Sequence, residues 1–117
     1  LKLSHFLDAL EAREALPAGS TAIVAIATET ALAPFKLGDY AAAGLDRLVG
    51  MTWGSEDLSA ALGASTNTDD TGRLSETYRM VRSMTLLGAK AAGVQAIDGV
   101  FVDFRDEAGL RASSVAS

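Results

Sequence analysis

The apolar positions of this chain change their spacing in a regular way along the sequence. Residues 3–16 place Phe6, Leu7 and Leu10 on one side of a helix, with polar residues elsewhere. Residues 21–27 then run without polar alternation. Such a run is typical of a strand that is buried on both faces of a parallel sheet. The chain therefore begins with a helix followed by a buried strand.

The same alternation of helical segments and apolar runs recurs further along the chain. It predicts strands over residues 46–53 and 95–102, helices over 34–43, 55–62 and 74–92, and a new helix beginning within 103–109. The longest of these helices places Tyr78, Val81, Thr85, Gly88 and Ala92 on one stripe. Strand–helix units in series indicate an α/β fold with a parallel sheet and right-handed crossovers. Two architectures fit, a doubly wound sheet and part of a (β/α)8 TIM barrel. The glycine-rich nucleotide fingerprints are absent from the sequence, and a whole barrel needs typically about 250 residues, against 117 here.

Composition narrows the classes of function. An apolar fraction of 49% with 21% charged residues predicts a packed core. The net charge of −5 argues against binding to a nucleic acid backbone, and no apolar run reaches membrane-spanning length. The sequence has no cysteine and a single histidine, His5, which disfavours thiolate metal sites and Ser-His-Asp hydrolysis. We expect a cytoplasmic domain whose chemistry depends on carboxylates, hydroxyls, backbone amides and Lys or Arg.

Two acidic residues follow the first two predicted strands. Glu29 comes directly after residues 21–27, and Asp57 follows residues 46–53. Neighbouring strands lie about 4.8 Å apart, and sites of α/β proteins lie at the carboxyl ends of strands, so both carboxylates can reach one cation. Mg²⁺ usually takes one or two protein carboxylates and leaves its other positions to water and substrate. The structural alternative is that Asp57 is a first-turn anion that stabilises a helix.

The segment between the second strand and the next helix is a second candidate site. Gly54, Ser55 and Glu56 occupy this turn. A glycine at a strand end followed by helix-start amides suits an anion, here a substrate carboxylate beside the cation. A tight turn that requires glycine explains the segment equally well. We expect Ser55 to cap the helix.

Six other positions receive structural interpretations. Trp53 is expected to serve packing, and Met80 and Met84 have the helical spacing of core residues. Arg82 is expected on a solvated face, where acidic neighbours offset its charge. Asp98 and Asp106 lie near the third predicted strand, and a helix cap is the favoured interpretation over contact with a ligand or an ion pair with Arg105.

Four motifs in series resemble the citrate lyase β-subunit-like family, which includes malyl-CoA and citramalyl-CoA lyases. They are residues 25–31 (AIATETA), 53–58 (WGSEDL), 91–98 (AAGVQAID) and 103–110 (DFRDEAGL). Each motif alone is moderately specific, but their order and spacing extend the similarity through nearly all of the chain.

The resemblance implies a (β/α)8 barrel, of which this chain covers about three consecutive strand–helix units. It implies Mg²⁺, or Mn²⁺, bound by Glu29 and Asp57. It also implies that amides of Gly54, Ser55 and Glu56 hold the carboxylate of a keto acid. Family members cleave or form a carbon–carbon bond in a 3-hydroxyacyl-CoA thioester of the citryl-, malyl- or citramalyl-CoA type. They commonly form trimers or hexamers, and their partners are acyl-CoA and keto-acid small molecules rather than nucleic acid or membrane.

The chain also departs from the family pattern. An upstream strand, an Asp-rich strand end, an arginine that clamps the substrate and the region after the seventh strand are all missing from it. We therefore expect residues 1–117 to be a fragment of the catalytic barrel that is inactive alone, and we assign no catalytic acid or base. Two alternatives stay open. One is a class II pyruvate aldolase that acts without CoA, although Ser55-Glu56 stands where that group usually carries Gly-Pro; the other is a catalytically silent partial barrel with a structural or assembly role.

Overall fold

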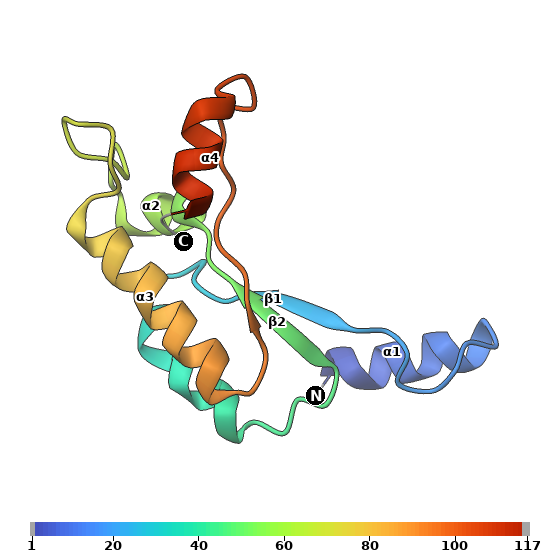
Figure 1. The fold of residues 1–117 in the computed structure, drawn as a ribbon. Coiled ribbons are helices and arrows are strands. Elements are labelled where there is room, and N and C mark those ends of the chain that lie inside the picture. The colour runs from blue at the N-terminus through green and yellow to red at the C-terminus, as the bar shows by residue number, and fades with distance from the viewer. Residues whose placement is uncertain (1, 116–117) are drawn as a thin grey trace.

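The protein has an α/β fold built on three parallel strands, as a computed structural model of residues 2–115 shows (Figure 1). In chain order the elements are α1 (Lys2–Arg13), β1 (Ile23–Ile26), the 3-10 helix η1 (Ala33–Ala42), β2 (Leu48–Thr52), α2 (Ser55–Leu62), α3 (Glu76–Ala91), β3 (Gln95–Ala96) and α4 (Glu107–Val115). The α/β class and the parallel sheet predicted from the sequence are confirmed.

The strands follow one another in the order β1-β2-β3 and all run in the same direction. Val24 pairs with Gly50, which in turn pairs with Gln95 on the next strand. Glycine suits this central position, because a Cβ there would lie 3.0 Å from the side chain of Ile97. Parallel strands end at a common edge, so the segments that follow β1 and β2 meet there.

Helices α3 and η1 cover one face of the sheet. The core between them consists of Ala27, Leu37, Leu48, Met51 and Ala89. The two helices approach closely at Gly88, where a Cβ would lie 3.1 Å from both the Cβ and the carbonyl oxygen of Leu37. A side chain at residue 88 would therefore force Leu37 to shift by a few tenths of an ångström, so glycine suits this contact. The buried stripe predicted for the long helix is confirmed at Tyr78, Val81, Thr85 and Gly88.

The opposite face of the sheet differs from the prediction. The side chains of Val24 and Ile26 are 49% and 54% exposed, so the prediction of a strand buried on both faces is wrong for β1. The reason is that α3 and η1 both pack against the other face, which carries Ile23 and Ala25. An apolar run by itself does not reveal how many layers cover a sheet.

The third strand is also shorter than predicted. β3 ends at Ala96, although the backbone N–H of Ile97 still donates to the carbonyl oxygen of Met51 at 2.9 Å. Val100 and Val102 are 84% and 72% exposed, so the prediction of a strand up to residue 102 is wrong. β2 itself ends at Thr52, which leaves the later residues no backbone partner on that strand.

Two predictions about helices need correction. Residues 33–42 form a 3-10 helix rather than an α-helix, with Pro34 in its first turn. Apolar spacing does not separate the two types, because both bring residues three or four apart to one side. Met80 is 52% exposed, so its assignment to the core is wrong, whereas Met84 packs against the core while half-buried.

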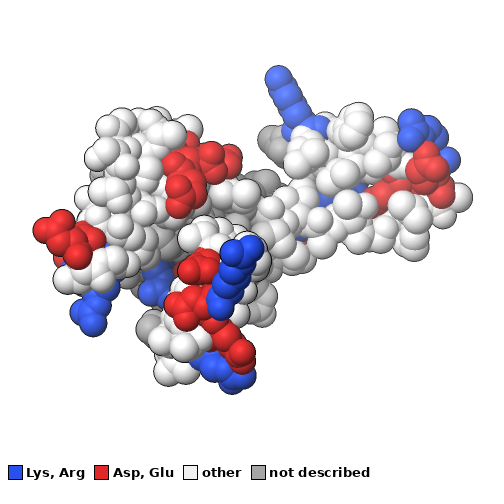
Figure 2. Space-filling view, turned by 90° about the horizontal axis from the view of Figure 1, so that it is seen from above, with Lys and Arg blue, Asp and Glu red and all other residues white. Residues whose placement is uncertain are grey.

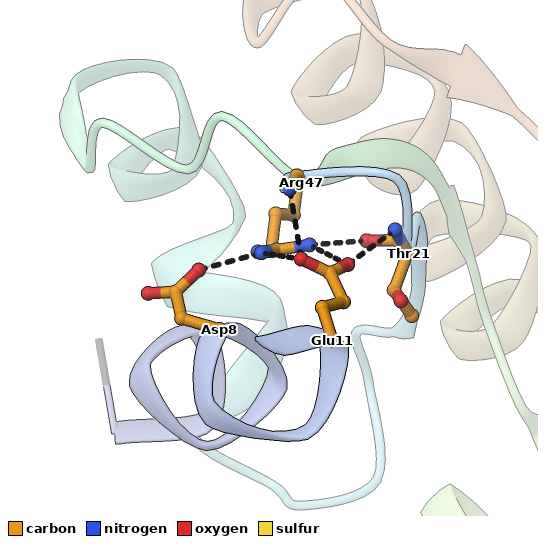
Figure 3. A network of polar contacts seen from close by, with 5 residues as sticks. Asp8, Glu11, Thr21 and Arg47 are labelled. Atoms are coloured by element: carbon orange, nitrogen blue, oxygen red, sulfur yellow. Dashed lines mark hydrogen bonds and ion pairs between the residues drawn. The ribbon is translucent and has the colours of Figure 1, made fainter. Parts of the chain in front are cut away.

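A buried ion-pair network fixes α1 to the amino-terminal end of the strands (Figure 3). Arg47, directly before β2, donates to both carboxylate oxygens of Glu11 at 2.7 Å and to Asp8 at 2.6 Å. Glu11 also accepts the backbone N–H groups of Gly19 and Thr21, at 2.8 and 2.7 Å. Glu11 is only 2% exposed and Arg47 only 8%, so the contact is shielded from solvent. In Figure 1 α1 lies beyond this end of the sheet, away from α3.

Acidification is expected to release α1 from the sheet. Hydrogen bonds from the Arg47 guanidinium hold the pKa of the Glu11 carboxyl well below its usual range. The unfolded chain therefore binds this proton more readily, so the network stabilises the fold above about pH 4 and loses its effect as the pH falls further. The protection of the amides of residues 2–13, taken relative to the intrinsic exchange rate at each pH, should fall between about pH 4 and pH 2. In Glu11→Gln this acid-dependent step should vanish, and a step that remained in the variant would contradict the assignment.

Charged side chains of both signs are interspersed on the surface. In the view from above, Lys and Arg lie next to Asp and Glu (Figure 2). Exposed pairs such as Lys36–Asp39, at 3.3 Å, contribute to this pattern. None of the helices within residues 2–115 combines the length and apolarity needed to cross a bilayer.

Candidate functional site

The segments that follow β1 and β2 are joined by hydrogen bonds at the carboxyl edge of the sheet. The backbone N–H of Ala27 donates to the carbonyl oxygen of Thr52 at 2.8 Å. One step further, the N–H of Gly54 donates to the hydroxyl oxygen of Thr28 at 3.1 Å. Thr28 is fully buried, so this hydrogen bond between the two segments is shielded from solvent. Glu29 directly follows this contact point.

Helix α2 begins at this edge with an open amino terminus. Gly54 is its N-cap, with an extended backbone at φ −121° and ψ 115°, and no side chain makes a capping hydrogen bond there. Ser55 is the first helical residue, so the prediction that Ser55 caps the helix is wrong. The glycine takes the cap position, and the first amides of the helix keep their capacity to bind an anion.

Acidic side chains lie around this helix start. Glu56 and Asp57 occupy its first turn, and both are exposed. The Asp57 side chain turns back toward the strand end: its Oδ2 atom would lie 3.6 Å from a Cβ placed on Gly54. Glu56 accepts a hydrogen bond from the amide of Asn67 at 2.9 Å. Asp57 therefore faces the edge of the sheet, whereas Glu56 is engaged by the following loop.

A hollow of about 210 Å³ opens beside these residues. It is lined by Ile26, Thr52, Trp53, Gly54, Ser55, Glu56, Asp57, Asp98 and Val100. The structure thus gathers four of the five predicted site residues around one hollow. Glu29 lies at the same edge, next to Thr28, and is exposed.

The donor set at this edge suits one kind of metal ion. Within residues 2–115, no three or more His, Cys, Asp or Glu side chains are placed to hold a metal on their own. Glu29 and Asp57 offer two carboxylates, which is the number that Mg²⁺ takes when water and substrate oxygens fill its other positions. Structural zinc sites and calcium sites need more protein ligands than this edge supplies.

Three residues near the site have roles that the sequence did not predict. Thr28 is the buried acceptor described above, and its signal was a polar residue at the end of an apolar run. Asp98 forms an ion pair with Arg82 at 2.6 Å, so the prediction of a helix cap is wrong for Asp98. The prediction that Arg82 lies on a solvated face is also wrong, because its side chain, like that of Asp98, is only 31% exposed.

Trp53 confirms its predicted role in packing and also contributes to the hollow. It is 6% exposed and packs with Leu58, Tyr78 and Val81 in a cluster between α2 and α3. Asp106 was also expected to cap the final helix. This is confirmed, because its carboxylate accepts the backbone N–H of Gly109 at 2.9 Å.

Known proteins resemble this chain over most of its length. Residues 6–116 match the family described as HpcH/HpaI aldolase/citrate lyase. The citrate lyase subunit beta-like protein of Mycobacterium tuberculosis is 43% identical over 83 residues, which cover 71% of this chain and 30% of that protein. The mitochondrial citramalyl-CoA lyase of Rattus norvegicus is 40% identical over 75 residues, which cover 64% of this chain and 20% of that protein.

A solved structure shows the same arrangement of elements. The citrate lyase beta subunit of M. tuberculosis, complexed with oxaloacetate and magnesium, aligns with a TM-score of 0.69 at 36% identity. The alignment covers 92% of this chain and 45% of that one. The chain therefore spans less than half the length of the relatives it matches, and the family resemblance carried by the four motifs is confirmed.

Proposed function

Because this chain belongs to the HpcH/HpaI aldolase/citrate lyase family, we propose that it carries the Mg²⁺-binding corner of a carbon–carbon lyase. The reaction is the cleavage or formation of a carbon–carbon bond in a 3-hydroxyacyl-CoA thioester of the citryl-, malyl- or citramalyl-CoA type. The observation that carries the proposal is the 3.1 Å hydrogen bond from Gly54 to Thr28, which brings the two acidic segments together. A relative named citramalyl-CoA lyase supports the thioester substrate, and a relative bound to oxaloacetate and magnesium supports the cation.

In this proposal the sheet is part of a (β/α)8 barrel. Residues 1–117 form about three consecutive strand–helix units of its catalytic domain. The exposed side chains of Val24 and Ile26 then belong to the inner face of the barrel. The proposal explains why a face that is apolar in sequence lacks a covering helix within residues 2–115.

Each site residue has a separate task. Glu29 and Asp57 hold the cation, which supplies Lewis-acid polarisation of the keto- or hydroxy-acid oxygens when bound. The helix-start amides of Ser55 and Glu56 bind and orient the carboxylate of the keto acid, because the uncapped amino terminus of α2 favours an anion. Gly54 contributes by setting the position of this helix start, since its own N–H already donates to Thr28. The proton transfer that accompanies carbon–carbon cleavage is assigned to none of these residues.

The setting of the protein completes the proposal. We infer a cytoplasmic homo-oligomer, trimeric or hexameric, whose partners are acyl-CoA and keto-acid small molecules. Mn²⁺ is expected to replace Mg²⁺, because carboxylate and water ligands suit both ions. The net charge of −5 supports small-molecule partners rather than nucleic acid.

A substrate panel tests this function. The purified protein at its native length should cleave malyl-, citramalyl- or citryl-CoA in the presence of Mg²⁺ and lose this activity with a chelator, as product analysis by mass spectrometry would show. Free hydroxy-keto acids should not be cleaved. Cleavage of the free acids alone would favour a class II pyruvate aldolase. Cleavage of neither class, with metal binding intact, would indicate a catalytically silent partial barrel.

A further inference from the structure

The carboxylate of Asp98 joins three separate segments of the chain. Its Oδ1 atom accepts hydrogen bonds from the indole Nε1 of Trp53, from Nε of Arg82 and from the backbone N–H of Gly99, each at 2.9 Å. Its Oδ2 atom accepts a second guanidinium N–H of Arg82 at 2.6 Å. The guanidinium of Arg82 thus forms a bidentate pair with the carboxylate, and this geometry fixes the orientation of the carboxylate.

The backbone around Asp98 is also pressed against the end of β2. Thr52 donates its hydroxyl to the carbonyl oxygen of Asp98 at 3.2 Å. A Cβ on Gly99 would lie 3.3 Å from Nε1 of Trp53, so only a glycine allows so close an approach without displacement. The indole is therefore held at its polar edge by Asp98 and Gly99.

Trp53 links this contact to the proposed site. It directly precedes the turn that runs from Gly54 to Asp57, and it is 6% exposed. Trp53 and Asp98 also line both the 210 Å³ hollow at the site and a larger hollow of about 460 Å³ beside α3. These two residues are the ones that the two hollows share. The contact that holds the indole therefore adjoins the hollow at the proposed site.

We propose that Asp98, fixed by Arg82, is a positioning residue that holds Trp53 and thereby sets the Gly54–Asp57 turn for binding the metal and the keto acid. This inference rests on the proposed function, because it assigns Asp98 an effect on that same site. Asp98 is not a metal ligand in this account, since its oxygens are engaged by the indole, the guanidinium and a backbone amide.

Mg²⁺ titration calorimetry on the protein at its native length tests the inference. In Asp98→Asn the amide oxygen can still accept from the indole, but the negative charge that pairs with Arg82 is lost. Mutation of groups that orient metal ligands typically weakens metal affinity about 10–100-fold, and we expect an increase of that size in the Kd for Mg²⁺. Trp53→Phe keeps an aromatic ring in the cluster but removes the N–H donor, so it should weaken binding in the same way. The double variant should be no weaker than the stronger single variant, because both act through one contact.

A matched control lies one turn earlier on α3. Arg79 lines the same larger hollow but pairs with Glu76. Arg79→Gln should leave the Kd for Mg²⁺ within about twofold of the wild-type value. Trp53 is the sole tryptophan, so its emission in metal-free protein reports the contact directly and should change in Asp98→Asn.

The outcomes separate the two proposals. Wild-type protein that binds no Mg²⁺ overturns the proposed function and this inference with it. Wild-type binding with an unchanged Kd in Asp98→Asn and Trp53→Phe overturns the positioning role alone. If Asp98→Asn does not fold, Trp53→Phe decides, because it leaves the Asp98–Arg82 pair in place and removes only the indole donor. Additive losses in the double variant would also contradict a shared contact.

Discussion

Replacing Asp57 with asparagine is expected to lower kcat/KM for acyl-CoA cleavage by about 10³-fold while leaving the fold intact. The variant keeps the size of the side chain but removes one of the two negative charges proposed to hold the cation. Metal ions contribute several kcal/mol of transition-state stabilisation, and each 1.36 kcal/mol corresponds to a factor of ten. Asp57 is exposed in the first turn of α2, so its replacement changes no buried contact. Steady-state kinetics over a series of Mg²⁺ concentrations would measure the effect.

Glu76→Gln is the matched control for this variant. Glu76 is also an exposed acid in the first turn of a helix, so both substitutions remove the same favourable interaction with a helix dipole. Glu76 begins α3 and does not line the hollow beside Asp57, so its variant should retain wild-type kcat/KM. Equal losses in the two variants, or full activity in Asp57→Asn, would refute the role of Asp57 as a ligand.

Replacing Glu11 with alanine is expected to produce the largest loss of stability. The change removes the two carboxylate oxygens that accept from the Arg47 guanidinium at 2.7 Å. The same oxygens accept the backbone N–H groups of Gly19 and Thr21, which also lose their acceptor. Arg47, which is 8% exposed in the folded protein, would keep only Asp8 as a charged partner. A buried charge that loses its partner is strongly destabilising, and we expect the Tm to fall by on the order of 10 °C. Thermal unfolding followed by circular dichroism would measure it.

Two comparisons show whether the buried network is the cause. Glu14 directly follows α1, and its ion pair with Arg13 is exposed. Glu14→Ala should therefore change the Tm by about 1 °C or less. Replacing both Glu11 with leucine and Arg47 with methionine should recover part of the loss, because no charge is then left buried. A Glu11→Ala variant that melts with the wild type would contradict the network's structural role.

The elements that depend on local sequence could be predicted well. Gly54 before an acidic first turn predicted the start of α2 at Ser55, and the structure places it there. The apolar stripe through Tyr78 and Val81 predicted the buried face of α3. In both cases the signal and the element lie within a few turns of chain, so the neighbouring residues decide the outcome.

Features that depend on distant partners could not be predicted. Glu11 and Arg47 are 36 positions apart, and nothing near either residue indicates that they meet. The apolar residues after β3 look like a continued strand, but Val100 is exposed because no neighbouring strand extends to it. Asp98 was read as a helix cap, since its partner Arg82 lies on another element.

The candidate site was predictable to a similar extent. Strand order places the segments after β1 and β2 at one edge, and the hydrogen bond from Gly54 to Thr28 agrees with that expectation. The contribution of Thr28 required the structure, because a hydroxyl at a strand end has many roles. The ligand roles of Glu29 and Asp57 stay predictions, supported by their place at this edge.

Metal binding by Glu29 tests the central claim most directly. We would titrate the native-length protein with Mn²⁺, follow free Mn²⁺ by electron paramagnetic resonance, and displace it with Mg²⁺. We expect one displaceable site per chain in the wild type, with a Kd at least about tenfold weaker in Glu29→Gln. Unchanged Mn²⁺ affinity in Glu29→Gln, or no bound Mn²⁺ in the wild type, would contradict it.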